Sequence, residues 1–139
     1  MLITKTIEKG LVKEAIYIRE KVFVEEQGFH DEFDELDETA FHLIIYCDGK
    51  PAATGRLLTN DGKAFKIGRV AVLKEYRDLK LGYKIMEYLE ERAREEGATS
   101  IVLSAQCPVQ GFYEKNGYTA YGDTYYDQHC PHINMKKVF

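Results

Sequence analysis

The chain has 139 residues, 45% of them hydrophobic, and a formal net charge of -4 at pH 7. This length suits one domain with a sizeable core and is short for two, so we expect a single domain over residues 1–139. The acidic balance and the scattered Lys and Arg residues do not make the cationic surface that nucleic-acid binding requires. No stretch is apolar for long enough to cross a bilayer, and the N-terminus lacks a secretion signal. We therefore expect a cytoplasmic protein without a nucleic-acid or membrane partner.

Three widely spaced cysteines, Cys47, Cys107 and Cys130, argue against a disulfide framework and favour a reducing compartment. Cys107 and Cys130 could be combined with His129 and His132 into a zinc site. The paired Cys-x-x-Cys or His-x-x-x-His spacing typical of zinc sites is missing, however. We therefore expect no metal.

Hydrophobic periodicity divides the chain into strands and helices. Apolar residues at three- and four-residue spacing predict helices, and β-branched or apolar runs between turn residues predict strands. We predict strands over residues 1–7, 41–47, 50–60, 64–73, 99–105, 118–126 and 132–138, and helices over residues 11–26, 81–96 and 108–116. The order β-α-β-β-β-α-β-α-β-β favours an α/β (α+β) fold.

Turn residues mark several boundaries between these elements. Asp48-Gly49 separates two predicted strands and favours the positive φ angles of a type I′ hairpin turn. Gly97 and Gly117 follow the second and third predicted helices, where a left-handed residue commonly ends a helix. Pro108 is placed to begin the third helix.

The junction between the strand that ends near Leu73 and the helix that begins near Leu81 is the most informative segment for function. A strand that passes through a polar loop into a helix directs free backbone N–H groups and the positive helix end to one point. That arrangement suits a pyrophosphate, and Arg77, Lys80 and Lys84 add positive charge there. Neither the P-loop nor the dinucleotide-binding glycine pattern is present. The residues alone therefore indicate an anion site.

The same segment resembles the phosphate loop of the GCN5-related N-acetyltransferases (GNAT), in which Gln/Arg-x-x-Gly-x-Gly/Ala follows a strand ending in an apolar triplet. Arg77, Gly82 and the triplet Val70-Ala71-Val72 match, and Lys80 occupies the place of the first glycine. The order of elements and the segment AQCPVQGFYEKNGY extend the resemblance over the whole chain. VFVEEQGF, ATGRLL and CPHINM are similar to small bacterial members of the YjcF-like and ElaA-like kind.

The resemblance implies a mixed, mostly antiparallel central sheet flanked by helices, with acetyl-CoA as co-substrate. In the family, the strand matching Val70 to Leu73 diverges from the parallel strand matching Ile101 to Ala105, and pantetheine enters the gap. Backbone groups of Val70 and Val72 would pair with its amides, and the Val72 N–H would polarise the thioester carbonyl. The implied cofactor-binding residues are Val70, Ala71, Val72, Arg77, Leu79, Lys80, Leu81, Gly82, Tyr83, Lys84, Gln106 and Phe112.

Two catalytic roles follow from the resemblance. Tyr113 matches the family tyrosine that protonates the departing thiolate, while the alternative for Phe112 and Tyr113 is aromatic core packing. The attacking amine must lose a proton, for which Glu25, Glu26, His132 and a water relay are candidates. Glu26 ends the first predicted helix, where the family builds its substrate wall, and is predicted as the catalytic partner of Tyr113.

The implied function is an N-acetyltransferase that moves acetyl from acetyl-CoA to an amine of a small molecule or peptide by direct attack in a ternary complex. Two alternatives are a CoA- or acyl-CoA-binding sensor module without turnover and an interaction domain that keeps only the fold. The acidic run from Asp31 to Glu38 either suits a cationic acceptor or is a solvated loop. Under oxidation Cys107 could form a mixed disulfide with CoA, and exposed C-terminal strands could pair in a homodimer.

Overall fold

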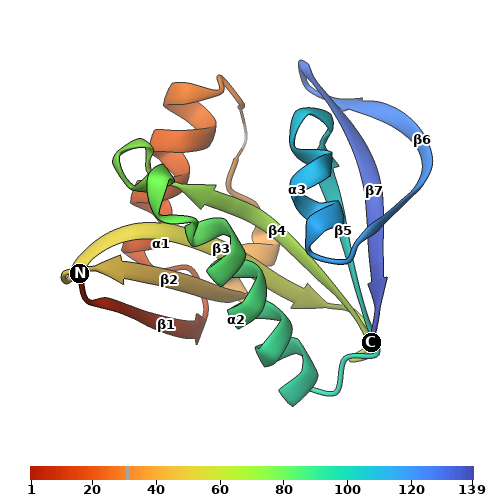
Figure 1. The fold of residues 1–139 in the computed structure, drawn as a ribbon, viewed down its shortest axis with the longest axis horizontal. Coiled ribbons are helices and arrows are strands. Elements are labelled where there is room, and N and C mark those ends of the chain that lie inside the picture. Colours follow the sequence, from red (N-terminus) through yellow and green to blue (C-terminus); the bar gives the residue numbers. More distant parts are fainter. Residues whose placement is uncertain (31) are drawn as a thin grey trace.

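The structure, a computed structural model, describes residues 1–30 and 32–139. Within these residues seven strands form one sheet in the order β1-β2-β3-β4-β5-β7-β6 (Figure 1). The strands are β1 (Ile3–Lys9), β2 (Phe41–Cys47), β3 (Lys50–Thr59), β4 (Ala64–Val72), β5 (Ser100–Gln106), β6 (Thr119–Asp127) and β7 (Cys130–Val138). Neighbouring strands run antiparallel except β4 and β5, which are parallel. The predicted mixed, mostly antiparallel sheet is confirmed.

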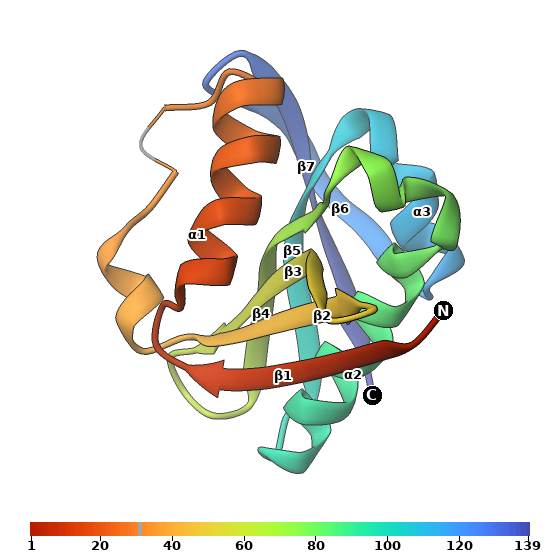
Figure 2. The same ribbon diagram turned by 90° about the vertical axis from the view of Figure 1, so that its left-hand side faces the viewer.

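Helices cover both faces of this sheet. On one face lies α1 (Lys13–Arg19), which continues into a π-helical segment (Glu20–Glu26), and on the other lie α2 (Leu81–Glu95) and α3 (Gln110–Lys115) (Figures 1 and 2). The order of strands and α-helices is the predicted one. The π-helical segment was not predicted, because its wider turn leaves no distinct hydrophobic pattern over seven residues. No helix in the described part of the chain is both long and apolar enough to span a membrane.

The turn residues adopt the expected backbone angles. Asp48 and Gly49 have φ angles of 50° and 81°, as a type I′ turn requires. Gly97 and Gly117 follow α2 and α3 with φ angles of 93° and 92°. At one edge of the sheet, β6 is exposed along nearly its whole length. The exposed edge proposed for a homodimer therefore exists, and dimerisation itself stays a prediction.

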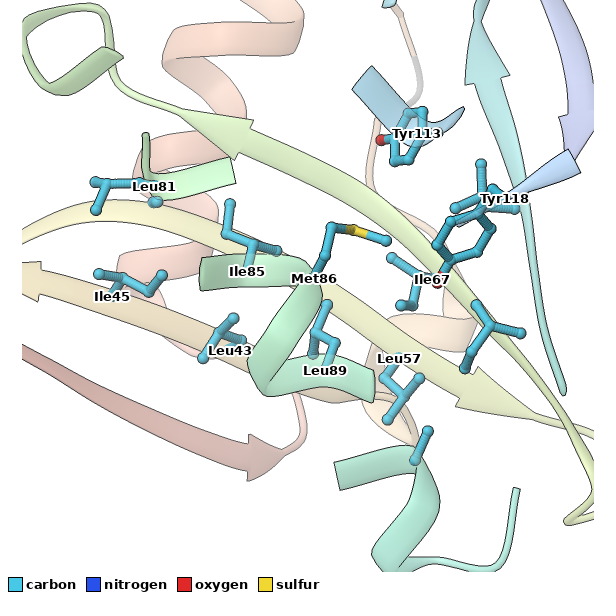
Figure 3. Close-up of a cluster of buried hydrophobic side chains, with 14 of the residues drawn as sticks. Leu43, Ile45, Leu57, Ile67, Leu81, Ile85, Met86, Leu89, Tyr113 and Tyr118 are labelled. Carbon is cyan, nitrogen blue, oxygen red and sulfur yellow. The ribbon is translucent and has the colours of Figure 1, made fainter. Parts of the chain in front are cut away.

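The main hydrophobic core lies between α2, α3 and the sheet (Figure 3). Buried side chains of α2 recur three and four residues apart and pack against β2, β3 and β4. At Gly55 of β3, a Cβ atom would lie 2.7 Å from Leu89 and 2.9 Å from Ile85, both fully buried. Glycine at this position therefore sets the close approach of α2 to the sheet. A smaller cluster on the other face contains Ile18, Val22, Phe23, Phe29, Ala71 and Leu73.

The parallel strands β4 and β5 pair only where they begin. Their ladder joins residues 64–66 to residues 100–102, and beyond it the two strands part (Figure 1). On the other side of β4, the pairing with β3 shifts register after Arg56↔Gly68, next to Arg69, whose φ angle is 51°. Such a bulge bends a strand and increases its twist. The predicted divergence of the two strands is thus confirmed, and it opens a gap in the sheet.

Candidate active site

A cavity of about 380 Å³ lies where β4 and β5 diverge. Its volume falls in the range of roughly 300–1,000 Å³ typical of small-molecule sites. It brings together Val70, Gln106 and Tyr113 from the predicted site, and His132 from the candidate bases. The remaining walls come from the segment after α1, from β3 and β4, and from the end of the β6–β7 hairpin.

The backbone of β4 presents donors toward this gap. The Leu73 N–H donates to the Ala52 carbonyl on β3 at 2.9 Å. Because successive N–H groups of a strand alternate in direction, the Val72 N–H points away from β3, toward the gap. Beyond Lys66 the ladder with β5 has ended, so Val70 and Val72 have no partner strand there. The two valines therefore offer a strand edge without a partner strand, as an extended ligand needs, with the Val72 carbonyl accepting a hydrogen bond from Arg77 Nε at 3.0 Å.

The start of α2 is suited to an anion. A 3-10 helix (Lys74–Leu79) leads to Lys80, and α2 begins at Leu81 without a side-chain cap on its N-terminal N–H groups. These N–H groups remain available as donors at the positive end of a 15-residue helix. The segment predicted to hold the pyrophosphate thus fits a phosphate group.

Lys80 adopts the left-handed conformation, with φ 56° and ψ 36°, at the place where the family pattern has glycine. This conformation costs a side chain with a Cβ atom about 1–2 kcal/mol, whereas glycine loses about 0.5–1 kcal/mol more backbone entropy on folding. We predict that Lys80→Gly raises the free energy of unfolding by about 0.5–1 kcal/mol in a urea titration. As a control, Lys84→Gly inside α2 should lower it by about 1 kcal/mol. A Lys80→Gly variant less stable than the wild type would contradict this explanation.

Gly82 is explained by an aromatic contact. A Cβ atom at Gly82 would lie 3.0 Å from the ring of Phe112, so that ring covers the start of α2. The Phe112 ring also lies 5.1 Å from Tyr83 and 5.0 Å from Tyr113 between centroids. These contacts connect the predicted phosphate-binding helix directly to Tyr113.

Tyr113 lies at the boundary between the main core and the cavity. Its ring belongs to the buried cluster shown in Figure 3, and the residue also lines the cavity. Burial raises the pKa of the Tyr113 hydroxyl to about 12, so the group stays protonated near neutral pH. Within the described residues the hydroxyl has no hydrogen-bond partner, unlike that of Tyr118, which donates to Glu90 at 2.8 Å. Tyr113 thus combines core packing with a proton that is available to a ligand.

Glu26, the predicted base, is bound to Arg77, a predicted phosphate ligand. The Arg77 Nη1 and Nη2 atoms lie 2.6 and 2.7 Å from the two Glu26 carboxylate oxygens, and Arg77 Nε donates to the Val72 carbonyl at 3.0 Å. The hydrogen bonds from Arg77 hold the pKa of the Glu26 carboxyl below its ordinary value, which makes it a weaker base. Neither residue is part of the cavity lining, and neither is Glu25. This geometry disfavours the two glutamates as bases.

His132 is the candidate base that lines the cavity. Its Nδ1 lies 2.9 Å from the Cys130 carbonyl oxygen. A carbonyl only accepts hydrogen bonds, so in the neutral ring Nδ1 carries the hydrogen and Nε2 keeps the lone pair. Nε2 has no hydrogen-bond partner among the described residues, and the ring stacks on Tyr125 with centroids 6.0 Å apart. The arrangement leaves an oriented proton acceptor in the cavity.

Carboxylates of the acidic run after α1 are ion-paired with arginines. Asp31, its first residue, lies outside the described residues, and Glu35 and Glu38 are exposed. The other three carboxylates form ion pairs with Arg19, Arg56 and Arg69 at these N–O distances: Arg19–Glu32 2.8 Å, Arg19–Asp37 2.8 Å, Arg56–Asp34 2.8 Å, Arg56–Asp37 3.0 Å and Arg69–Glu32 2.7 Å. Burial opposes ionisation of Asp37, but hydrogen bonds from Arg19 and the Asp34 backbone outweigh it and lower the Asp37 pKa to about 2. The interpretation of these three residues as a rim for a cationic acceptor is therefore wrong, because their charge is already compensated.

Cys107 and Cys130 are free thiols in the structure: Cys107 follows β5, Cys130 begins β7, and both are partly exposed. Among the described residues, no group of three or more His, Cys, Asp and Glu side chains is arranged to hold a metal ion. The mixed disulfide of Cys107 with CoA stays a prediction.

Comparison with known proteins shows to which family the chain belongs. The acetyltransferase (GNAT) domain family matches residues 10–139, so the chain belongs to this family. It is 38% identical over 129 residues to the uncharacterised N-acetyltransferase YjcF of Bacillus subtilis, an alignment that covers 91% of each chain. The family resemblance predicted from the sequence is confirmed.

Solved structures agree with this assignment. An acyl-CoA N-acyltransferase from Pseudomonas aeruginosa is similar with a TM-score of 0.87 and 29% identity, covering 99% of this chain and 100% of that one. ElaA from Escherichia coli is similar with a TM-score of 0.88 and 26% identity, covering 98% of this chain and 99% of that one. The fold predicted from the sequence, a GNAT-like domain, is thus confirmed.

Proposed function

We propose that this chain, as one domain over residues 1–139, transfers an acetyl group from acetyl-CoA to an amine of a small molecule or peptide. The observation that carries the proposal is the cavity at the divergence of β4 and β5, which is lined by Val70, Tyr113 and His132. An unpaired strand edge, a protonated hydroxyl and an oriented imidazole thus surround one space. Direct attack in a ternary complex is favoured when a cofactor-holding edge, an acid and a base are held around one space.

Acetyl-CoA would supply the activated acetyl thioester. The unpaired edge of β4 at Val70 and Val72 would hold the pantetheine, with the Val72 N–H directed at the thioester carbonyl oxygen. The N–H groups from Leu79 to Lys84 would hold the pyrophosphate. Arg77 would add charge only after it releases Glu26, to which it is bound in the structure. Gln106, Leu81, Tyr83 and Phe112 would complete the walls around the cofactor.

Tyr113 and His132 have opposite tasks in this proposal. An amine attacks only in its neutral form, and His132 Nε2 would take the proton that the amine loses. Tyr113 would give its proton to the thiolate that leaves. The base role thereby moves from Glu26, which Arg77 engages, to His132.

We expect His132→Gln to lower kcat by about a hundredfold, the lower end of the usual contribution of a general base. Glutamine keeps a polar group in the cavity but accepts no proton. The matched control is Glu26→Gln, for which we expect less than a threefold change. A larger loss in Glu26→Gln than in His132→Gln would return the base role to Glu26.

The second candidate function is a CoA-binding sensor without turnover. It is favoured by the ion pair with Glu26, which engages Arg77, the arginine of the phosphate-loop motif. Two measurements separate the candidates. Acetyl-CoA at a hundred times its dissociation constant should stabilise the protein by about 2.7 kcal/mol in a thermal unfolding experiment. Release of free thiol in the presence of an amine then indicates a transferase. Stabilisation without thiol release, over a panel of amino acids, polyamines, aminoglycosides and peptides, indicates a sensor, and no stabilisation contradicts both.

A further inference from the structure

Arg56 lines the cavity, and one of its guanidinium nitrogens, Nη2, is left without a hydrogen-bond partner among the described residues. Its side chain is only 6% exposed, and its Nη1 atom makes both of its ion pairs, to Asp34 and Asp37. Its Nε–H is buried without a partner, and Nη2 has no hydrogen-bond partner among the described residues. Because the Nε atom is closed off, Nη2 is the donor that a ligand oxygen could reach. A ligand oxygen that reaches Nη2 would give this donor a hydrogen bond.

A second cation lies next to Arg56. In the ladder between β3 and β4, Arg56 pairs with Gly68 and Leu58 pairs with Lys66. Arg56 and Lys66 are therefore diagonal neighbours on one face of the sheet, at a separation of about 7–8 Å that long side chains bridge. Lys66 lines the cavity, is exposed, and makes no ion pair with a described residue. Lys66 thus presents an unpaired positive charge at the β3–β4 side of the cavity, next to Arg56, whose charge is paired with Asp34 and Asp37 and whose Nη2 is a free donor.

The opposite side of the cavity has the reverse charge. Asp127 lines it from the end of β6, where it pairs with Cys130 of β7, two residues from His132. Its carboxylate makes no ion pair with a described residue. The remaining carboxylate of the lining, Glu32, is shared by Arg19 and Arg69. The cavity is thus polar along its length, with cations near β3 and β4 and an anion near the candidate base.

We propose that Arg56 and Lys66 form a carboxylate-binding subsite, and that the acceptor is an amine that also carries a carboxylate, such as an amino acid. This inference rests on the proposed transferase function and specifies its substrate class. The carboxylate lies against Arg56 Nη2 and Lys66, and the amine lies toward Asp127 and His132. Asp127 attracts the ammonium form, and His132 takes the proton when the neutral amine reacts.

The test is thiol release with matched pairs of acceptors: free amino acids and the same amino acids as carboxamides. The carboxamide keeps the amine and the side chain but removes the negative charge. We expect kcat/KM for the acid to exceed that for the carboxamide by tenfold or more, about the effect of one charge-assisted contact. The KM of the acid should rise with ionic strength, because salt screens partly exposed charges.

The variant Lys66→Gln tests the subsite without disturbing the fold, since Lys66 is exposed and unpaired. We expect it to raise the KM for the acid about tenfold, to leave kcat near the wild-type value, and to leave the carboxamide unaffected. The control is Lys50→Gln, on the same strand as Arg56 but at the β2–β3 turn, away from the cavity. Arg56→Lys keeps the charge but loses the free Nη2 donor, and should lower kcat/KM for acids alone, with thermal unfolding confirming that it folds.

The outcomes separate this inference from the transferase proposal. Equal turnover of acids and carboxamides, or preference for polyamines, overturns the subsite and leaves the transferase standing. An unchanged KM in Lys66→Gln also overturns it. The subsite is also overturned if no carboxylate-bearing amine is turned over. The transferase proposal fails only if no amine of any class releases thiol.

Discussion

Replacement of Tyr113 by phenylalanine should lower kcat by about a hundredfold and leave the affinity for acetyl-CoA nearly unchanged. The variant loses only the hydroxyl, and the ring keeps its contacts with Phe112 and Tyr118. The effect should lie at the low end for general acids, because the proton moves uphill. The hydroxyl has a pKa of about 12, whereas a free thiol has one of about 8.5. Steady-state thiol release gives kcat, and thermal unfolding with acetyl-CoA gives the affinity.

Tyr118→Phe is the matched control for this prediction. The Tyr118 hydroxyl donates to Glu90 at 2.8 Å, inside the core and away from the cavity lining. Its loss should lower stability and leave kcat within about twofold, because a structural hydroxyl touches no reacting atom. An unchanged kcat in Tyr113→Phe would mean that Tyr113 serves only as aromatic core.

Arg19→Met should lower the free energy of unfolding by about 3–5 kcal/mol, the usual effect of removing one partner from a buried ion pair. Arg19 is fully buried, and its guanidinium donates to Glu32 and Asp37, which are buried as well. Methionine matches much of its volume but leaves both carboxylates without their main partner. A loss of this size is a large part of the 5–15 kcal/mol that stabilises a typical domain.

Urea titrations of Arg19→Met and of the control Lys21→Met measure the free energy of unfolding of two variants on one helical segment. Lys21 and Glu25 form an exposed pair at 3.3 Å, which contributes at most about 0.5 kcal/mol. A loss below about 1 kcal/mol in Arg19→Met would show that the buried network adds little to stability.

The network also holds the segment after α1. In this segment the His30 backbone is hydrogen bonded to the Gln128 side chain at 2.6 and 2.8 Å, and both residues line the cavity. Arg19→Met should therefore loosen a cavity wall as well.

Local signals in the sequence predicted the frame of the fold. Asp48-Gly49 and Gly97 predicted turns because their backbone angles depend on residue type, and the spacing in α2 predicted a core-facing helix. The buried network of arginines and carboxylates was missed because its partners are 13 to 37 residues apart in the sequence. Pairing at such separations leaves no periodic pattern. One signal existed: Arg19 falls on the apolar face of its helix, where a charge needs a buried partner.

The candidate site was predictable in part. Val70, Gln106 and Tyr113 were expected from the family resemblance, and the cavity brings them together. The Arg77–Glu26 pair was not predicted, because it joins the end of the π-helical segment to the 3-10 helix before α2, which are far apart in the chain. The orientation of His132 depends on the Cys130 carbonyl, and the free Nη2 of Arg56 depends on which of its nitrogens meet the acidic segment. Such atomic choices are set by packing and leave no mark in the order of residues.

A crystal structure of the protein with bound CoA tests the central claim most directly. We predict pantetheine between β4 and β5, paired with the backbone of Val70 and Val72, and the pyrophosphate on the N–H groups at the start of α2. The sulfur should lie within hydrogen-bonding distance of the Tyr113 hydroxyl. CoA bound elsewhere, or a sulfur that points away from Tyr113 and the cavity, would contradict the account.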